Sequence, residues 1–504
     1  MEATDTWAKV RTILSDTSKL EGTVALLEWD ERTYLPSRAG GYRADQTTLL
    51  SGVIHRRRTD PQLGEMLQEL THSELAQEPH SPTGASILKL WKDFQRYARL
   101  PVDLVEATTR AIVLGQQAWE LARAANSWTD FAPHMEKIFA LRRQEAELLR
   151  DDGSLYDALL DQYEEGARSE QLTNVFAGLR DLLVQLVKEL TESSNQPTGA
   201  SWRRSVPIDL QRAASRWIAE RIGYNFQRGR LDETSHPFCT TLGPDDCRIL
   251  TRFHLNNFPS GFFSTLHEAG HGLYEQGLPH EWYGLPAGSA ASLGVHESQS
   301  RMWENFVGRS LAFWEWCLPE LQSSLGGTWD DLSLPQVYRD ANCVQPSLIR
   351  VEADEVTYNL HILIRFEIEQ ELISGELRVA DAPQAWNDRY FRYLGIRPTN
   401  FADGILQDIH WSAGLIGYFP TYTLGNLYAA QLMEAVERDL GDVSPAFRQG
   451  DFAPLRNWLI KNIHQHGRCL HPGQLVQQAC GHPLDAAPLA NYLRQKLEPV
   501  YGLA

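Results

Sequence analysis

The stretch Leu266-His267-Glu268-Ala269-Gly270-His271-Gly272-Leu273-Tyr274 decides how the rest of the chain is interpreted. Residues four apart share one face of an α-helix, so His267 and His271 can point both imidazoles at one metal ion. Glu268 is turned by about 100° around the axis and flanks the ion without binding it. The pattern is typical of zinc sites that activate water. Two incidental histidines are the alternative, and such a match arises by chance with a probability on the order of a few per cent.

The residues around this motif favour a buried helix. Leu266, Ala269 and Leu273 give it an apolar side, and Gly270 leaves room for another helix to approach closely. Gly277 is the predicted C-terminal stop. The sequence therefore predicts a packed helix with a polar ligand face.

A catalytic zinc usually has three protein ligands, and Glu297 is the predicted third. It lies in Val295-His296-Glu297-Ser298-Gln299, on a following helix that Ser292 would cap and that would run through Trp303 and Phe306. The alternative for Glu297 is a solvated surface carboxylate. A thermolysin-like third ligand would be followed four residues later by Asp. Arg301 occupies that position, so the site is not of that subtype.

Composition limits the class of protein. The 504 residues are 42% hydrophobic and 22% charged, which is ordinary for a globular protein. The net charge of −18 disfavours nucleic-acid binding. The N-terminus has no signal-peptide pattern, no apolar run reaches membrane-spanning length, and the six cysteines form no Cys-x-x-Cys pair. We therefore expect no membrane and a reducing, cytoplasmic location.

The chain reads as mainly α-helical. We expect one catalytic domain made of a helical N-terminal part (1–205), a part that holds the metal and substrate site (206–426) and C-terminal helices (427–504). Residues 247–253 alternate as a short strand does, and we assign this small sheet the role of an edge that binds an extended substrate. The C-terminal histidines are predicted to be surface or loop residues, namely His464, His466, His471 and His482.

Two polar stretches suit a substrate site. Arg350 stands in a charge cluster with Glu352, Asp354 and Glu355, which predicts either a solvated helix start or an arginine held by carboxylates and offered to a carboxylate ligand. Residues 394–426 combine glycines, aromatics and isolated polar groups, a composition that suits a site lining better than a plain core.

Several sequence blocks together resemble the carboxypeptidase Taq family of metallocarboxypeptidases. They are His-Pro-Phe (236–238), Asp-x-Arg (246–248), His-Glu-x-x-His (267–271), His-Glu-Ser-Gln (296–299), Ile-Arg-x-x-Ala-Asp (349–354), Gly-x-x-Gln-Asp-x-His-Trp (404–411) and Gly-Tyr-Phe-Pro-Thr-Tyr (417–422). One departure is visible, because the Asp-x-Arg block usually continues x-Thr. This chain has Leu250 there and Thr251 one residue later.

The resemblance implies a large helical body with a deep central groove and a small β-sheet beside the metal helix. It also implies a homodimer that releases single residues from peptides with a free C-terminus, with broad specificity. One divalent ion per chain would be held by His267, His271 and Glu297. Zinc is expected, and cobalt or manganese could substitute.

The carboxypeptidase reaction that this resemblance implies needs further groups, and the chemistry of each step assigns them. Glu268 would accept and return the proton of the attacking water. By analogy with angiotensin-converting enzyme, in which a His and two tyrosines follow in similar order, His410 and Tyr422 would donate hydrogen bonds to the oxyanion, with Tyr418 as a weaker candidate. The alternative for each is a satisfied core residue. Arg350 would bind the substrate carboxylate, with Arg248 and Arg397 as alternatives. His236 and Gln407 would complete the substrate site.

Two other functions remain open from the sequence. An oligopeptidase of the same chemistry would cleave internally, and an inactive helical scaffold would only bind peptides. Retention of Glu268 beside the predicted ligands counts against the scaffold, because a scaffold needs no base at that place.

Overall fold

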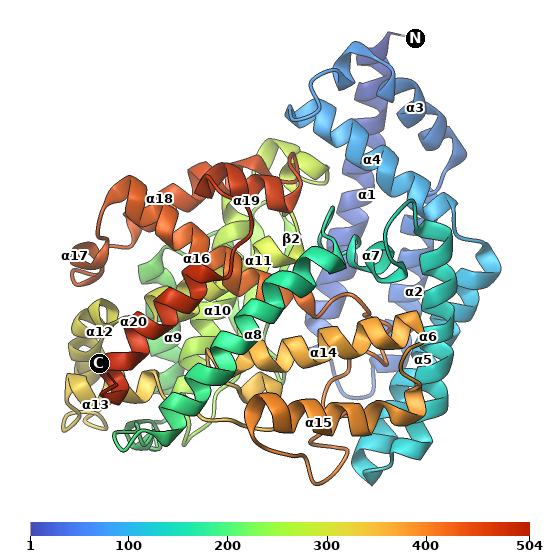
Figure 1. Ribbon diagram of the computed structural model, residues 1–504. Coiled ribbons are helices and arrows are strands. Elements are labelled where there is room, and N and C mark those ends of the chain that lie inside the picture. The colour runs from blue at the N-terminus through green and yellow to red at the C-terminus, as the bar shows by residue number, and fades with distance from the viewer. Residues whose placement is uncertain (1, 504) are drawn as a thin grey trace. The chain divides into compact units, whose positions relative to one another are not determined.

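The structure is a computed structural model that describes residues 2–503, and nearly all of its regular structure is helical (Figure 1). It divides into two compact units, each assembled from three separate segments of the chain. Unit 1 comprises residues 1–97, 199–341 and 432–483, and unit 2 comprises residues 98–198, 342–431 and 484–504. Unit 1 thus takes segments from all three predicted parts of the sequence. The assignment of one catalytic domain stays a prediction.

Unit 1 holds the N-terminal helices, the sheet and the helices around the predicted metal ligands. Its α-helices are α1 (Ala3–Glu31), α2 (Gly40–Arg58), α3 (Pro61–Thr71), α4 (Pro82–Ala98, apart from its last residue), α9 (Ile208–Ile222), α10 (Phe258–Gly277), α11 (Leu293–Arg301), α12 (Leu311–Ser324), α13 (Leu334–Ala341), α17 (Ser444–Phe447), α18 (Ala453–Asn462) and α19 (Pro472–Cys480). Its shorter turns are η1 (Glu74–Ala76), η2 (Ala200–Trp202), η3 (His280–Trp282), η4 (Pro286–Gly288), the π-helical η5 (Met302–Val307) and η8 (His464–His466).

The sheet has three strands, β1 (Gly229–Glu233), β2 (Phe238–Gly243) and β3 (Asp246–Thr251), in the order β1-β3-β2. β3 pairs in parallel with β1 and antiparallel with β2. The role of the sheet in binding substrate stays a prediction, but the strand predicted at 247–253 is present as β3 and is central, not an edge. Both of its hydrogen-bonding sides are already used within the sheet, which leaves β1 and β2 as the outer strands.

Helix α10 lies against this sheet and is backed by an aromatic cluster. Gly272 faces the ring of Tyr224 and the side chain of Ile249, so α10 rests directly on β3. On another side of the helix, Phe262 and Phe263 pack with further aromatic residues, namely Trp202, Phe258, Phe313, Trp314 and Trp329. Because all of these side chains except the half-buried Trp202 are buried, α10 has a rigid support.

Unit 2 is built from long helices. They are α5 (Val102–Ala125), α6 (Trp128–Leu149), α7 (Leu155–Leu160), α8 (Ser169–Glu192), α14 (Thr357–Ser374), α15 (Ala382–Leu394) and α20 (Ala487–Tyr501), with the turns η6 (Arg350–Glu352) and η7 (Val379–Asp381). Helix α16 (Pro420–Leu440) begins in unit 2 and continues into unit 1. α14 and α15 run side by side (Figure 1), and α14 is buried on almost all sides. A helix buried all round presents polar side chains to its neighbours only where they have partners.

Candidate metal centre and arginine cluster

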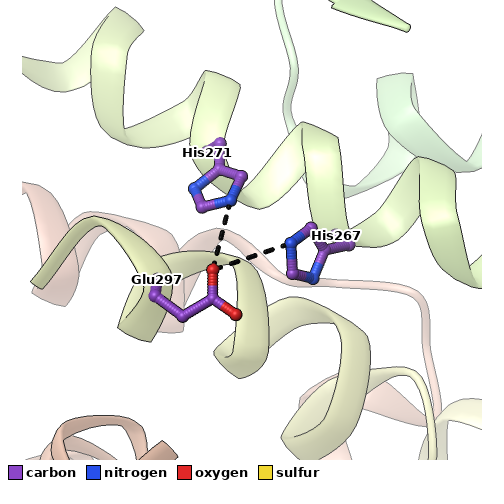
Figure 2. A group of neighbouring side chains, drawn as sticks. All are labelled: His267, His271 and Glu297. Carbon is purple, nitrogen blue, oxygen red and sulfur yellow. Dashed lines mark ion pairs between the residues drawn. The ribbon is translucent and has the colours of Figure 1, made fainter. Parts of the chain in front are cut away.

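The two histidines of the sequence motif lie on one face of α10. Asn257 caps this helix, where its side chain accepts a hydrogen bond from the backbone of Ser260 at 3.4 Å, and the helix ends at the predicted Gly277. The ring centroids of His267 and His271 are 4.9 Å apart, and both imidazoles turn toward Glu297 (Figure 2).

Glu297 comes from α11, whose predicted cap is present: Ser292 Oγ accepts from the backbone N–H of Val295 at 3.0 Å. Glu297 Oε2 lies 3.8 Å from His267 Nε2 and 3.6 Å from His271 Nε2. Tetrahedral zinc ligands at about 2.0–2.1 Å from the ion stand about 3.4 Å from one another. Both distances to Glu297 exceed this spacing by only a few tenths of an ångström, and all three donor atoms lie within 4.8 Å of one another. Two imidazoles and a carboxylate are also the donors that a catalytic zinc prefers.

The group formed by His267, His271 and Glu297 is the only one of its kind among the described residues. Among residues 2–503, no second group of histidine, cysteine and acidic side chains gathers in the same way, and none of the six cysteines forms a disulfide. Nor does any helix of these residues have both the length and the apolar character needed to cross a membrane.

Gly270 explains how α11 comes close enough to α10. A Cβ added at this residue would lie 2.6 Å from the carbonyl oxygen of Gln299 and 2.7 Å from Cα of Ser300. The two helix backbones therefore touch at this crossing, and only glycine fits there. The close approach predicted from the small residues is confirmed, and it is what brings Glu297 to the histidines.

The outer nitrogen of each histidine has a partner that fixes its tautomer. Nδ1 of His271 donates to the backbone carbonyl of His296 at 3.0 Å, because a carbonyl oxygen can only accept. Nδ1 of His267 lies 2.9 Å from Glu304 Oε2. In both rings the Nε2 lone pair is thereby directed into the site, as a metal ligand requires.

Sequence reasoning missed Glu304. It lies seven residues after Glu297, about two helical turns on, at the point where α11 passes into the π-helical turn η5. That spacing was the available signal, because residues seven apart share a helix face. Burial alone would raise the pKa of Glu304, but the guanidinium of Arg301 and the contact with His267 outweigh it and hold the pKa well below its ordinary value.

Glu268 is buried beside the ligand face, with 6% of its surface exposed. Burial raises the pKa of this carboxyl to about 7, with the neighbouring His267 opposing the shift and Glu297 adding to it. A carboxyl that titrates near neutrality can both take up and release a proton. The arrangement suits the predicted base.

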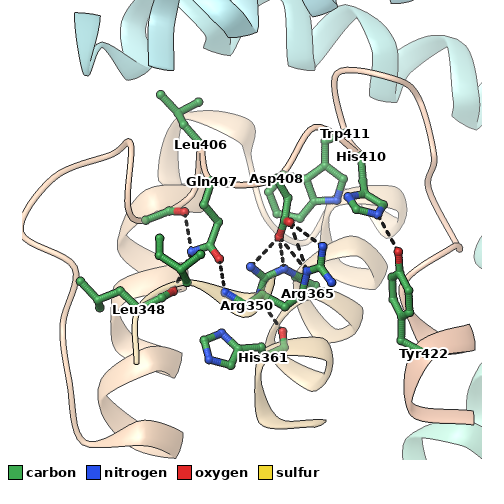
Figure 3. A network of polar contacts seen from close by, with 12 residues as sticks. Leu348, Arg350, His361, Arg365, Leu406, Gln407, Asp408, His410, Trp411 and Tyr422 are labelled. Carbon is green, nitrogen blue, oxygen red and sulfur yellow. Dashed lines mark hydrogen bonds and ion pairs between the residues drawn. The ribbon is translucent and has the colours of Figure 1, made fainter. Parts of the chain in front are cut away.

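In unit 2, the segment 404–411 is tied down by its own polar side chains (Figure 3). Gln407 accepts from the backbone N–H of Arg350 at 2.9 Å and donates to the carbonyl of Leu348 at 2.9 Å. Its amide thus supports the segment that carries Arg350, and its role as a substrate contact stays a prediction. Trp411 donates to Glu369 at 2.8 Å, which anchors the segment to α14.

Asp408 receives two arginines (Figure 3). Nε and Nη2 of Arg350 lie 2.9–3.3 Å from its carboxylate, and Nε of Arg365 donates to it at 2.7 Å. Both arginines are buried, with 5% and 0% of their surface exposed. Burial would raise the pKa of Asp408, but the two guanidiniums outweigh it and hold it well below its ordinary value. This arginine cluster (Arg350, Arg365 and Asp408) carries one more positive than negative charge.

Arg350 pairs with Asp408 and not with the acidic residues next to it in the sequence. Asp354 instead caps α14, where it accepts from the backbone N–H groups of Val356 and Thr357 at 2.9 and 3.0 Å. The acid next to it, Glu355, pairs with Lys496 of α20. Arg350 and Glu355 are therefore paired with residues distant along the chain, whereas Asp354 is used locally as a cap.

His410 and Tyr422 are brought together, with His410 Nε2 3.2 Å from the tyrosine hydroxyl (Figure 3). Burial lowers the pKa of His410 to about 3, with Asp408 opposing and Arg350 adding to the shift, so the imidazole is neutral at pH 7. Tyr418 packs on the ring of His410 at 5.4 Å and on Tyr163 at 5.2 Å.

The other predicted substrate residues, His236, Arg248 and Arg397, do not belong to the arginine cluster. His236 is exposed between β1 and β2. Arg248 pairs with Asp246 at 2.7 Å and stacks over Trp29, and Arg397 is an exposed partner of Asp388 at 3.5 Å. His464 is buried and bonds Gln299 at 2.9 Å, so its prediction as a surface or loop residue is wrong.

The departure in the Asp-x-Arg block has a structural account. Leu250 is fully buried in β3. Thr251, one residue later, is also buried, and its hydroxyl donates to the carbonyl of Gly261 in α10 at 3.2 Å. The threonine thus ties the sheet to α10.

Known proteins resemble this chain over almost its full length. The family profile of the carboxypeptidase Taq (M32) metallopeptidases matches residues 9–497. Thermostable carboxypeptidase 1 of Thermus thermophilus is 43% identical over 97% of both chains, and carboxypeptidase 1 of Bacillus subtilis is 36% identical over 97% of this chain and 98% of its own. The crystal structure of an M32 carboxypeptidase from Deinococcus radiodurans superposes with a TM-score of 0.96 at 38% identity, covering 99% of this chain and all of that one.

Proposed function

Since this chain belongs to the carboxypeptidase Taq (M32) family of metallopeptidases and is a metal-dependent carboxypeptidase, we propose that it releases single amino acids from peptide C-termini with broad specificity. The observation that carries the C-terminal specificity is the arginine cluster, in which two buried guanidiniums share the single carboxylate of Asp408. A buried excess of positive charge is costly unless an anion compensates it. The free C-terminus of a peptide supplies that anion.

Zinc is the ion we propose for the set His267, His271 and Glu297, with cobalt or manganese as substitutes. The spacing of the donor atoms and the tautomers fixed by Glu304 and the carbonyl of His296 support this assignment. When bound, such an ion acts as a Lewis acid that lowers the pKa of water to about 7 and polarises a carbonyl.

The residues of the chain handle the protons. Glu268, with its pKa raised to about 7, takes the proton from the attacking water and hands it to the leaving amine. His410 and Tyr422 donate hydrogen bonds to the oxyanion that forms on the scissile carbonyl, and Tyr418 orients His410 through ring contact. His410 can donate as a neutral imidazole, since its pKa of about 3 keeps it uncharged.

Arg350 is the residue that we propose for the substrate carboxylate. Its Nε and Nη2 face Asp408 and its Nη1 donates to Tyr358 at 2.9 Å, which fixes the plane of the guanidinium. A guanidinium has five N–H donors, so these contacts leave donors for a ligand. Fixing the plane in advance reduces the entropy lost when a carboxylate binds.

The decisive experiment is digestion of one unstructured peptide, with its C-terminus either free or amidated, followed by mass spectrometry with and without a chelator. Successive single-residue losses from the free peptide, abolished by the chelator and absent for the amide, support the proposal. Internal fragments from both peptides would establish the oligopeptidase instead. A protein that gives no products after addition of zinc, cobalt or manganese would be the peptide-binding scaffold.

A pair of arginine variants tests the carboxylate site. Arg350→Gln should lower kcat/KM on free peptides by about 10- to 150-fold, the value of a charged hydrogen bond, and change little on amidated ones. Arg397→Gln is the matched control, because Arg397 is an exposed arginine of the same unit. Equal loss on both peptides would remove Arg350 from this role, and a selective loss in Arg397→Gln would transfer the role to that residue.

We propose that the protein works as a homodimer in the cytoplasm. Cysteines that form no disulfide within residues 2–503 support a reducing compartment. Sedimentation equilibrium tests the assembly, and a monomer at micromolar concentration would contradict it.

A further inference from the structure

Glu304 and Arg301 form a connected pair behind the metal ligands. In the thermolysin-like arrangement the third ligand is followed four residues later by Asp, whereas here Arg301 stands at that place. The acid comes three residues further on, on the π-helical turn η5. Single π-helical turns inside α-helices occur frequently at functional sites.

The contacts show what each of the two residues does. Glu304 Oε2 lies 2.9 Å from His267 Nδ1, so this carboxylate sets the orientation of the first ligand. Arg301 Nε donates to Glu297 Oε1 at 2.7 Å, and its Nη1 donates to Glu304 Oε2 at 3.1 Å. One guanidinium therefore bridges the third ligand and the carboxylate behind the first.

This bridge also fixes which oxygen of Glu297 faces the histidines. Because Oε1 is held by Arg301, Oε2 is the oxygen left to approach both Nε2 atoms. Arg309 adds a second cation, 3.6 Å from Glu304 Oε1. The two carboxylates are thus balanced by two guanidiniums, and all four side chains have low exposure.

The structure is reinforced at this point by close packing. A Cβ added at Gly308 would lie 2.7 Å from the carbonyl oxygen of Glu304 and 2.7 Å from Cδ1 of Leu266. The end of η5 therefore presses on α10 one residue before His267. This packing of Gly308 against the Leu266 side chain fixes the position of Glu304 relative to His267, and the Glu304 side chain has little freedom to move.

We propose that Glu304 is the positioning residue for the ligand His267, and that Arg301 couples it to the ligand Glu297, so that the two ligands are oriented as one unit. Partners of this kind typically change metal affinity by 10- to 100-fold when they are removed. The inference rests on the proposed metal assignment.

The test measures zinc affinity of the full chain by competition with a chromogenic chelator, together with the visible absorption spectrum of the Co²⁺ form. Glu304→Ala should weaken zinc binding by about 10- to 100-fold and alter the Co²⁺ bands, which report ligand geometry. Glu304→Gln should recover part of the affinity, because its amide oxygen can still accept from His267 Nδ1 while the charge is lost. It also serves where Glu304→Ala fails to fold.

Glu275→Ala is the matched control. Glu275 is likewise a carboxylate paired with a histidine, lying 2.9 Å from Nε2 of His296, which is not one of the three ligands. It should bind zinc within about threefold of the unaltered protein, a change below the range expected for ligand partners. Affinity and Co²⁺ bands unchanged in both Glu304 variants, or equal losses in Glu275→Ala, would overturn the inference. Failure of the unaltered protein to bind zinc would instead overturn the proposed metal site.

Discussion

The proposed metal centre of unit 1 suits a cation and the arginine cluster of unit 2 suits an anion, and the two are built differently. In the metal centre, two imidazole lone pairs and a carboxylate converge on one point, an arrangement made for a cation. In the arginine cluster, two buried guanidiniums share one carboxylate, an arrangement made for an anion. The first stands on two regular helices, whereas the second is held by an irregular segment between α15 and α16.

The two sites are held in place by different kinds of contact. Helical periodicity and one close backbone crossing position the metal ligands. In the arginine cluster, side chains of the irregular segment bond to partners more than 40 residues away along the chain, such as Asp408 to Arg365 and Trp411 to Glu369. The geometry of the arginine cluster therefore depends on a network of buried polar contacts. Removing a single member of such a network costs a large free energy.

The largest effect should come from the base beside the metal ligands. Glu268→Gln removes the proton acceptor and leaves all three ligands, so kcat should fall by about 10²- to 10⁴-fold at unchanged metal content. Steady-state kinetics and metal analysis of the same sample measure both quantities. Activity within tenfold of the unaltered enzyme would exclude Glu268 as the base.

In the arginine cluster, removing the carboxylate should destabilise the protein more than removing one arginine. Asp408→Ala leaves two buried guanidiniums without their carboxylate and should cost about 3–5 kcal/mol of unfolding free energy. Arg350→Ala leaves the neutral pair of Arg365 and Asp408 and should cost clearly less. Denaturation followed by tryptophan fluorescence compares them, and equal losses would refute the excess positive charge.

Glu369 should make the stability of unit 2 depend on pH. It accepts from Tyr156, Trp411 and the backbone of Gly417 at 2.7–3.0 Å, yet burial outweighs these donors and raises its pKa to about 7 from an ordinary 4.5. Its neutral form is favoured in the folded protein, so this contribution is present in full below about pH 4.5 and is lost as the pH rises through about 7.

The loss between pH 5 and pH 8 should be on the order of 2–3 kcal/mol. Glu369→Gln carries no titrating proton and should lack this component. Unfolding free energies of both proteins at the two pH values measure it, and parallel pH profiles would show that Glu369 does not titrate in this range.

The helix crossing at the metal centre should tolerate no added methyl group. Gly270→Ala places Cβ within 2.6 Å of the α11 backbone, and relieving such overpacking should cost about 1–3 kcal/mol and weaken zinc binding. Gly178→Ala is the control, because no atom lies within 4 Å of its added Cβ. It should be neutral or stabilising by up to about 1 kcal/mol. Unchanged zinc affinity in Gly270→Ala would show that the crossing of α10 and α11 does not influence the proposed metal site.

The smallest effect concerns a helix cap. Ser292→Ala removes the cap of α11 and should cost about 1 kcal/mol, with a modest loss of zinc affinity because Glu297 lies on this helix. Ser310 caps α12 in the same way, accepting from Phe313 at 3.2 Å. Ser310→Ala should lose similar stability and no zinc affinity. Equal zinc affinity in the two variants would show that the cap does not influence the site.

The sequence by itself determined the features that depend on near neighbours. The face shared by His267 and His271, the cap at Ser292, the helix end at Gly277 and the mainly helical class all follow from spacing and local propensity. The need for a third ligand beside the His-Glu-x-x-His motif carried the choice of Glu297, because a glutamate alone is more often a surface residue.

Only the tertiary structure decided which groups meet over long distances. It assigned Asp408, rather than the adjacent acids, to Arg350, and it made β3 a central strand. It revealed Glu304 as the partner of His267, and it showed that Gln407 binds the backbone and that His464 is buried. Local periodicity specifies which face a side chain occupies, whereas the partner of a buried polar group is set by whichever distant segment packs against that face.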